Sequence, residues 1–153
     1  MQYFHCTLVL VRNTISMKIK IIVAVLLIVS FSSCKKDSTA RQTQYNIIPQ
    51  NSSGVTGTVT FIEQPSLSQT EVDIEVKNTP GYYYVAHIHQ GTPSLYRGAI
   101  YIFDPIYSSS SHISFQQNIP LLYDSALTLN GTFVLHDSTG NNVLGLCGIG
   151  VNK

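Results

Sequence analysis

Alternating hydrophobic and polar residues dominate the chain from Gly54 onward. The segment GVTGTVTFIE places Val55, Val59 and Phe61 on one face, opposite three threonines, and TEVDIEVKN places three hydrophobic residues opposite its charged ones. A period of two is typical of β-strands that bury one face. The turn-like connection QPSLSQ lies between the two segments, so the pattern predicts a β-hairpin.

Further short strands are predicted along the rest of the chain. They are YYYVAHIH, RGAIYIFDP, HISFQQNI, a longer strand ALTLNGTFVLHD that is interrupted near Asn130-Gly131, and the closing VLGLCGIGV. Turn signals such as NTPG and DSTGNN separate them, and no helical period is convincing. The sequence therefore predicts an all-β domain over residues 54–153, an antiparallel sandwich or barrel of about seven to eight strands.

Residues 17–33 have the layout of an export signal. MKIK is followed by an apolar run from Ile21 to Val29 and then by FSSC, which resembles the lipobox of bacterial lipoproteins. By this resemblance Cys34 is lipidated and is the first mature residue, residues 34–53 form a flexible tether, and residues 1–16 are an over-extended gene start. The protein is expected in the bacterial cell envelope, on its periplasmic or outer-membrane face. An uncleaved anchor helix is the alternative, and it also exports the domain.

Charge and cysteine content narrow the possible partners. Residues 34–153 hold all eight acidic residues and fewer basic ones, so the exported part carries a small negative charge. A nucleic-acid partner is therefore not expected, whereas the lipid anchor predicts a membrane. If Cys34 is acylated, Cys147 has no partner for an intrachain disulfide and is interpreted as a buried small hydrophobe.

The histidines are the candidate chemistry. Side chains alternate along a strand, so His87 and His89 share one face, opposite Ala86 and Ile88. Imidazole is a usual ligand of copper and zinc, and three imidazoles with an open position form a reactive site. His136 ends a distant strand and can join the pair only if the fold brings it close. Alone, His-x-His is a weak signal, and two exposed strand histidines are its more frequent explanation.

Several segments, in order, resemble copper/zinc superoxide dismutase: VTGTVTFIE, PGYYYVAHIHQGT, GTFVLHD and LGLCGIGV. The resemblance implies a Greek-key β-sandwich or flattened barrel. It also implies that His87, His89 and His136 are copper ligands, and it places His112 at the family's zinc site.

This chain departs from the dismutase pattern around that zinc site. It has no counterpart of the bridging histidine, Phe115 stands where the family has a zinc-ligand aspartate, and Leu144 stands at the guiding arginine. Copper is therefore the predicted cofactor and zinc is not expected. Arg97 is the remaining arginine near the predicted site, although its spacing does not place it at the metal. Superoxide dismutase activity is expected to be weak or absent, and no catalytic residue is assigned.

A second family competes for the same segment. AHIHQGTPSLYRGAIYIFD is similar to the His-Ile-His segment of CHRD domains, which are β-sandwich modules of the bacterial envelope, among others. By that resemblance the domain is a binding module with structural histidines. A copper-scavenging or delivery protein with the same three ligands is a further alternative. Tyr82, Tyr83 and Tyr84 are interpreted as strand residues, with alternate rings on the core.

Overall fold

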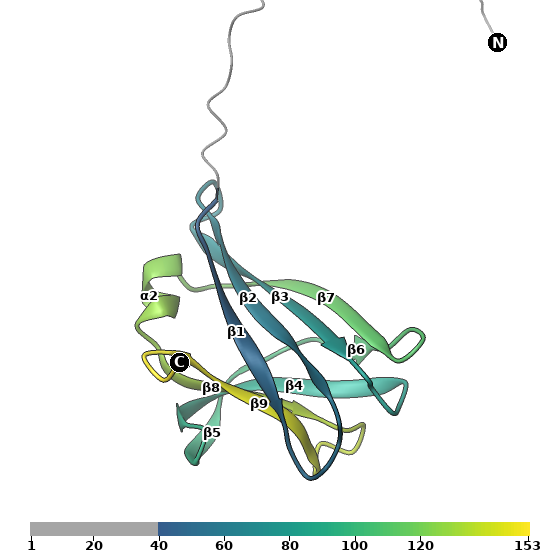
Figure 1. Ribbon diagram of the computed structural model, residues 1–153. Helices are drawn as coiled ribbons and strands as arrows, with labels where there is room; N and C mark the ends of the chain where they lie inside the picture. The colour runs from purple at the N-terminus through teal and green to yellow at the C-terminus, as the bar shows by residue number, and fades with distance from the viewer. Residues whose placement is uncertain (1–39) are drawn as a thin grey trace, which may run out of the picture. The chain divides into compact units, whose positions relative to one another are not determined.

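A computed structural model describes residues 40–153, whose regular secondary structure is almost entirely β-strand (Figure 1). One short helix, α2 (Tyr123–Leu127), is the exception. The strands are β1 (Gln42–Pro49), β2 (Thr56–Gln64), β3 (Gln69–Lys77), β4 (Tyr83–Thr92), β5 (Leu95–Ile102), β6 (Ile106–Tyr107), β7 (His112–Ile119), β8 (Asn130–His136) and β9 (Val143–Gly150). The predicted all-β antiparallel fold class is confirmed.

The strands form one antiparallel sheet that curls into a half-barrel. Its order is β5-β4-β8-β9-β1-β2-β3-β7, and β6 adds to β4. β2 and β3 are the hairpin predicted from the alternating pattern, paired from Thr56 with Lys77 to Gln64 with Gln69. β5 and β7 are the two edges of this order. The Tyr101 hydroxyl on β5 bridges them, because it accepts a hydrogen bond from Gln117 Nε2 at 3.1 Å on β7.

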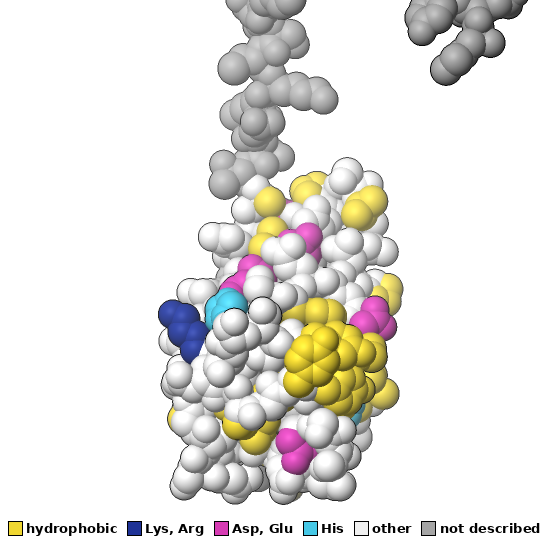
Figure 2. All heavy atoms as spheres, turned by 90° about the vertical axis from the view of Figure 1, so that its right-hand side faces the viewer, with side chains coloured by type: hydrophobic (Ala, Val, Ile, Leu, Met, Phe, Trp, Pro, Cys, Tyr) yellow, Lys and Arg dark blue, Asp and Glu magenta, His cyan; other side chains and the backbone are white. Residues whose placement is uncertain are grey.

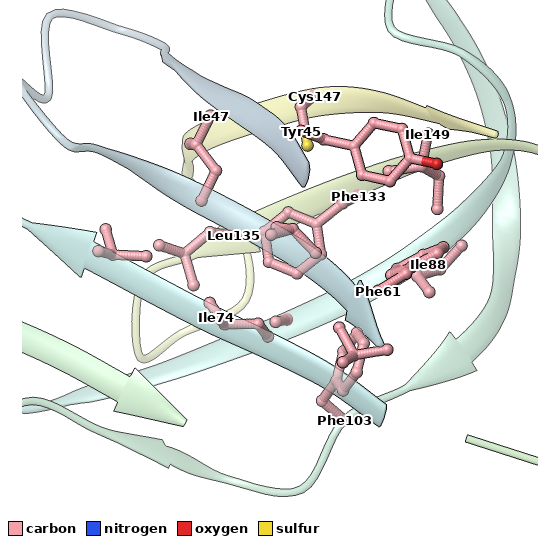
Figure 3. Close-up of a cluster of buried hydrophobic side chains, with 14 of the residues drawn as sticks. Tyr45, Ile47, Phe61, Ile74, Ile88, Phe103, Phe133, Leu135, Cys147 and Ile149 are labelled. Carbon is pink, nitrogen blue, oxygen red and sulfur yellow. The ribbon is translucent and has the colours of Figure 1, made fainter. Parts of the chain in front are cut away.

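The concave face of the curled sheet holds the hydrophobic core (Figure 3). Strand alternation explains its membership: along β3, every second residue from Thr70 to Val76 is buried, and the acidic residues between them face outward. Phe133 and Leu135 of β8 point into this core from the opposite wall of the half-barrel. Burying such side chains is the main favourable contribution to folding. The core also fixes which face of each strand points away from it.

β1 corrects the domain boundary. It runs from Gln42 to Pro49, inside the stretch 34–53 that the sequence assigns to a tether, and it pairs with β2 along six residues. Tyr45 and Ile47 are each only 4 % exposed, so β1 contributes to the core. The folded domain therefore begins well before Gly54. The expected gene extension 1–16, signal peptide 17–33 and lipidated Cys34 lie outside the described residues.

The segment before β8 also differs from the prediction. The long strand expected for ALTLNGTFVLHD begins only at Asn130, and residues 123–127 form helix α2 instead. Ala126 is buried and Tyr123 is 5 % exposed, so this single turn packs on the core. Arg41 ties the helix to β2 because its guanidinium contacts Asp124 at 2.8 Å and Glu63 at 2.7 Å. Tertiary packing thus overrides the strand-like composition here.

Candidate metal centre

β4 and β8 bring three histidines to one face of the sheet. Along β4, Ala86 and Ile88 are buried in the core. His87 and His89 alternate with them and therefore lie on the convex face of the strand. β8 pairs with β4 so that Val134 is opposite His87 and His136 is opposite Val85. Directly paired residues point to the same face of a sheet, so His136 shares the face of the other two.

The three rings are close enough to share one ion. One ligand nitrogen from each of His87, His89 and His136 lies within 4.8 Å of the other two. The His87 ring centroid is 5.4 Å from that of His89 and 5.3 Å from that of His136, and the third pair is 6.2 Å apart. The predicted convergence of these residues is therefore present in the fold, and the cluster could hold a metal ion. Its geometry does not identify the metal.

A hairpin positions the His89 ring from two sides. The Nδ1 atom of His89 lies 2.7 Å from the carbonyl oxygen of Arg97, and the ring of Tyr96 packs 4.9 Å from the His89 ring. A carbonyl can only accept, so this contact places the proton on Nδ1 and leaves Nε2 as a lone-pair donor. Such outer contacts are typical of metal-binding histidines, since they fix the tautomer and the ring orientation.

The turn of this β4–β5 hairpin needs a glycine. Gly91 has φ +110°, and a Cβ there would lie 2.5 Å from the Leu95 carbonyl oxygen. Two side chains outside the hairpin hold Gly91 in place: the Thr132 hydroxyl donates to its carbonyl at 2.7 Å, and the Asn152 amide does so at 3.1 Å. No sequence motif predicts that the Tyr96 ring packs against His89 or that the Arg97 carbonyl contacts it. Only the Gly-Thr-Pro turn after His89 hints at a sharp reversal there.

The imidazole nitrogens match what a metal requires. His89 Nε2 and both nitrogens of His136 are buried and make no hydrogen bond to any residue of 40–153. Buried polar atoms without partners are uncommon in proteins, and ion-binding sites are one place where they occur. Burial lowers the pKa of His136, and His87 and His89 lower it further, while Asp137 opposes the shift slightly. Burial also lowers the pKa of His87. Neutral imidazole, the form that binds metal, is therefore favoured.

Other predicted residues lie away from the histidine cluster. His112 begins β7 and contacts Glu75 on β3, with Nε2 2.8 Å from the carboxylate. Phe115 packs against the core, and its ring centroid lies 6.4 Å from that of Phe103. Arg97 contacts the centre through its carbonyl, and the residue also lines a hollow with Gln90 and Asn130 that none of the three histidines lines. These positions supply no further ligand to the three histidines.

Cys147 faces the core from β9, opposite Phe133, and is 3 % exposed. Burial raises the pKa of its thiol to about 12, so the predicted role as a small buried hydrophobe fits the structure.

Tyr83 and Tyr84 lie on β4 and point to opposite faces, whereas Tyr82 precedes the strand, so its prediction as a strand residue is wrong. Tyr84 is 1 % exposed and belongs to the core, as predicted for alternate rings. Tyr82 and Tyr83 instead pack against Tyr107 of β6, with ring centroids 5.4 and 5.6 Å apart. Tyr82 and Tyr107 are both more than half exposed. A prominent hydrophobic patch appears on the face of the domain that carries β6 and the start of β4 (Figure 2). On the convex face of β4, this patch lies at the start of the strand, before His87 and His89.

Comparison with known proteins leaves the family open. A scan against protein-family models found no match, and a search of curated proteins found none either. The resemblances to superoxide dismutase and to CHRD domains therefore stay predictions. Within residues 40–153, no helix has the length and hydrophobicity needed to span a bilayer.

Proposed function

We propose that this protein is an envelope lipoprotein whose β-domain binds one copper ion through His87, His89 and His136. The observation that carries the copper proposal is the convergence of one nitrogen from each ring within 4.8 Å. The contact between His89 Nδ1 and the Arg97 carbonyl supports the copper proposal, because a proton on Nδ1 leaves the Nε2 lone pair free to bind the metal. The lipid anchor on Cys34 rests on the FSSC segment alone.

Copper is favoured over zinc by the general order of affinity of first-row metals for nitrogen ligands. In this order, divalent copper binds such ligands more tightly than zinc does. A structural zinc, which takes four protein ligands, does not fit this cluster of three imidazoles, whereas a catalytic zinc with three histidines has the same donor set. A second metal beside the first has no support, since His112 is paired with Glu75 on β3 and Phe115 has no ligand atom.

We further propose that the domain holds copper with little or no superoxide turnover, as a dismutase-like scavenging or delivery protein. Rapid reaction with an anion benefits from a positive field at the site. On the strands of the described domain, no lysine or arginine is paired with the three histidines, and Arg97 lines another hollow. A CHRD-type module with structural histidines is the competing proposal. The buried His136 nitrogens without partners count against it, because structural histidines usually make hydrogen bonds.

Copper titration of single variants tests the metal proposal. Apo-protein is titrated with Cu(II) at neutral pH and followed by electron paramagnetic resonance, where nitrogen coupling reports bound imidazole. His87→Ala, His89→Ala and His136→Ala should each weaken binding sharply. His112→Ala is the matched control and should leave binding unchanged, because its ring contacts Glu75 on another part of the sheet. Equal, weak binding by the wild type and all four variants, with Cu(I) as well as with Cu(II), would refute convergence on one ion.

Palmitate labelling tests the lipoprotein proposal separately. The full chain, expressed in a bacterium that processes lipoproteins, should incorporate a palmitate analogue and partition into membranes. Cys34→Ala should abolish both effects, whereas Cys147→Ala, which changes a buried core residue, should retain the label. Labelling that persists in Cys34→Ala contradicts the assignment without affecting the copper proposal.

A further inference from the structure

The donor set of the metal centre carries no negative charge. The three ligands are imidazoles, which are neutral when they bind metal, and the cluster includes no carboxylate or thiolate. A bound ion therefore keeps its full charge: +1 for Cu(I) and +2 for Cu(II) or Zn(II). The surroundings must then stabilise that charge, or the ion of lower charge is favoured.

The residues paired with the cluster are uncharged as well. Within the sheet, His87 is paired with Val134 on one side and Ile102 on the other, and His136 is paired with Val85. His89 lies between Thr132 and Ala99, and the ring of Tyr96 packs against its imidazole. None of these neighbours can offset positive charge.

The nearest acidic side chain in sequence, Asp137, is already engaged. Its carboxylate accepts hydrogen bonds from the Thr139 hydroxyl at 2.7 Å, from the Thr139 backbone N–H at 3.1 Å and from the Asn142 side chain. These contacts close the 137–142 turn and hold the carboxylate in it. Asp137 is not among the residues whose ligand atoms converge at the cluster. It is a weak counter-charge for an ion at the cluster.

Two physical effects favour a monovalent over a divalent ion at this centre. The cost of moving an ion out of water rises with the square of its charge, so this cost is about four times larger for a divalent than for a monovalent ion. Geometry acts in the same direction. Cu(II) prefers a tetragonal set of at least four donors, whereas the fold provides three. Closed-shell Cu(I) is satisfied by two or three donors.

We propose that this centre is selective for Cu(I) over Cu(II) and Zn(II). The inference rests on the proposed copper function and adds to it the oxidation state that the protein handles. A site that favours Cu(I) raises the reduction potential of its copper, because the reduced form is bound more tightly. Each tenfold preference corresponds to about 59 mV for a one-electron couple. Such a centre stores or transfers reduced copper instead of cycling it.

The test compares affinities for three ions on the full chain. Cu(I) is titrated without oxygen in competition with bathocuproine disulfonate, and Cu(II) and Zn(II) are titrated against nitrilotriacetate. We expect Cu(I) to bind at least 100-fold more tightly than Cu(II), a potential shift of about 120 mV relative to aqueous copper. Zn(II) should bind more weakly than Cu(I) as well.

Ile102 offers a variant that tests the charge argument directly. It is 64 % exposed and lies opposite His87 on β5, so Ile102→Glu places a carboxylate beside the cluster without disturbing the core. The ratio of Cu(I) to Cu(II) affinity should fall at least tenfold in this variant. Ile102→Gln has the same length without the charge and should keep the wild-type ratio. Unfolding curves of both variants check that the fold is unchanged.

The outcomes separate the two proposals. A wild-type protein that binds none of the three ions refutes the copper function, and the selectivity with it. A protein that binds Cu(II) or Zn(II) as tightly as Cu(I) refutes only the selectivity. An equal shift in Ile102→Glu and Ile102→Gln also refutes it, because the carboxylate charge would then not be the cause.

Discussion

Replacing Gly91 by alanine tests whether the β4–β5 hairpin holds His89 in its binding position. Gly91 has φ +110°, and the new Cβ would lie 2.5 Å from the Leu95 carbonyl oxygen and 3.2 Å from Tyr96 Cα. Backbone strain of this kind costs about 1–3 kcal/mol. Because the clash is with backbone atoms, the hairpin must also shift, and Tyr96 and the Arg97 carbonyl move with it.

The effect on copper follows from the contact between His89 and Arg97. Loss of an outer partner of a metal ligand typically lowers metal affinity about 10- to 100-fold. At a free copper concentration 100 times the wild-type Kd, binding stabilises the wild type by about 2.7 kcal/mol. For Gly91→Ala at the same concentration, the same relation gives about 0.4–1.4 kcal/mol. Urea unfolding with and without copper measures both increments.

Gly54→Ala is the matched control. Gly54 also has a positive φ, +69°, but a Cβ there would have no neighbour within 4 Å. Its stability should fall by about 1 kcal/mol from backbone strain alone, with the full copper increment retained. If Gly91→Ala keeps the wild-type copper increment, the hairpin does not orient His89. If Gly54→Ala loses the increment too, the loss reflects general destabilisation.

Three further predictions concern β1, pH and the free thiol. Ile47→Ala should lower the free energy of unfolding by about 2–5 kcal/mol, because Ile47 is buried on β1; a change near zero in denaturant unfolding would mean that β1 is dispensable. The apo-protein should lose stability as pH falls below about 6.5, because the folded-state pKa values of His87 and His136 are lowered and the unfolded chain binds protons first. Above that pH both histidines are neutral in the folded and the unfolded chain, so they add no further change in stability. A stability profile that is flat between pH 5 and 8 would contradict the prediction. Cys147 should react with a thiol reagent at pH 8 only after unfolding, since burial raises its pKa to about 12, and fast labelling of the native protein contradicts that placement.

Local pattern was sufficient for much of the sheet and for two ligands of the metal centre. A period of two assigned β2 and β3 and joined them as a hairpin, because each predicted segment has three hydrophobic residues on one face next to a turn signal. The same period put His87 and His89 on one face, since residues two apart in any strand point the same way. It also predicted that Ala86 and Ile88 face the core, and both are buried.

β1 and α2 were missed for a common reason. β1 has only two buried side chains, Tyr45 and Ile47, within a polar stretch, so its strand character depends on pairing with β2. α2 is one turn of five residues, too short to show a helical period, and its buried residues are held by the core beneath them. Neither element carries enough local signal to be recognised before its neighbours are known.

Residue pattern alone predicts that His87 and His89 form a geometric unit, whereas only a family resemblance places His136 beside them. The fold decides that third position, because β4 and β8 are far apart in the sequence and their register sets which side chains meet. A shift of that register by one residue would turn His136 to the opposite face. The contact from the Arg97 carbonyl is likewise a tertiary result. Every residue has a carbonyl, so residue type cannot show which carbonyl the folded backbone will aim at an imidazole.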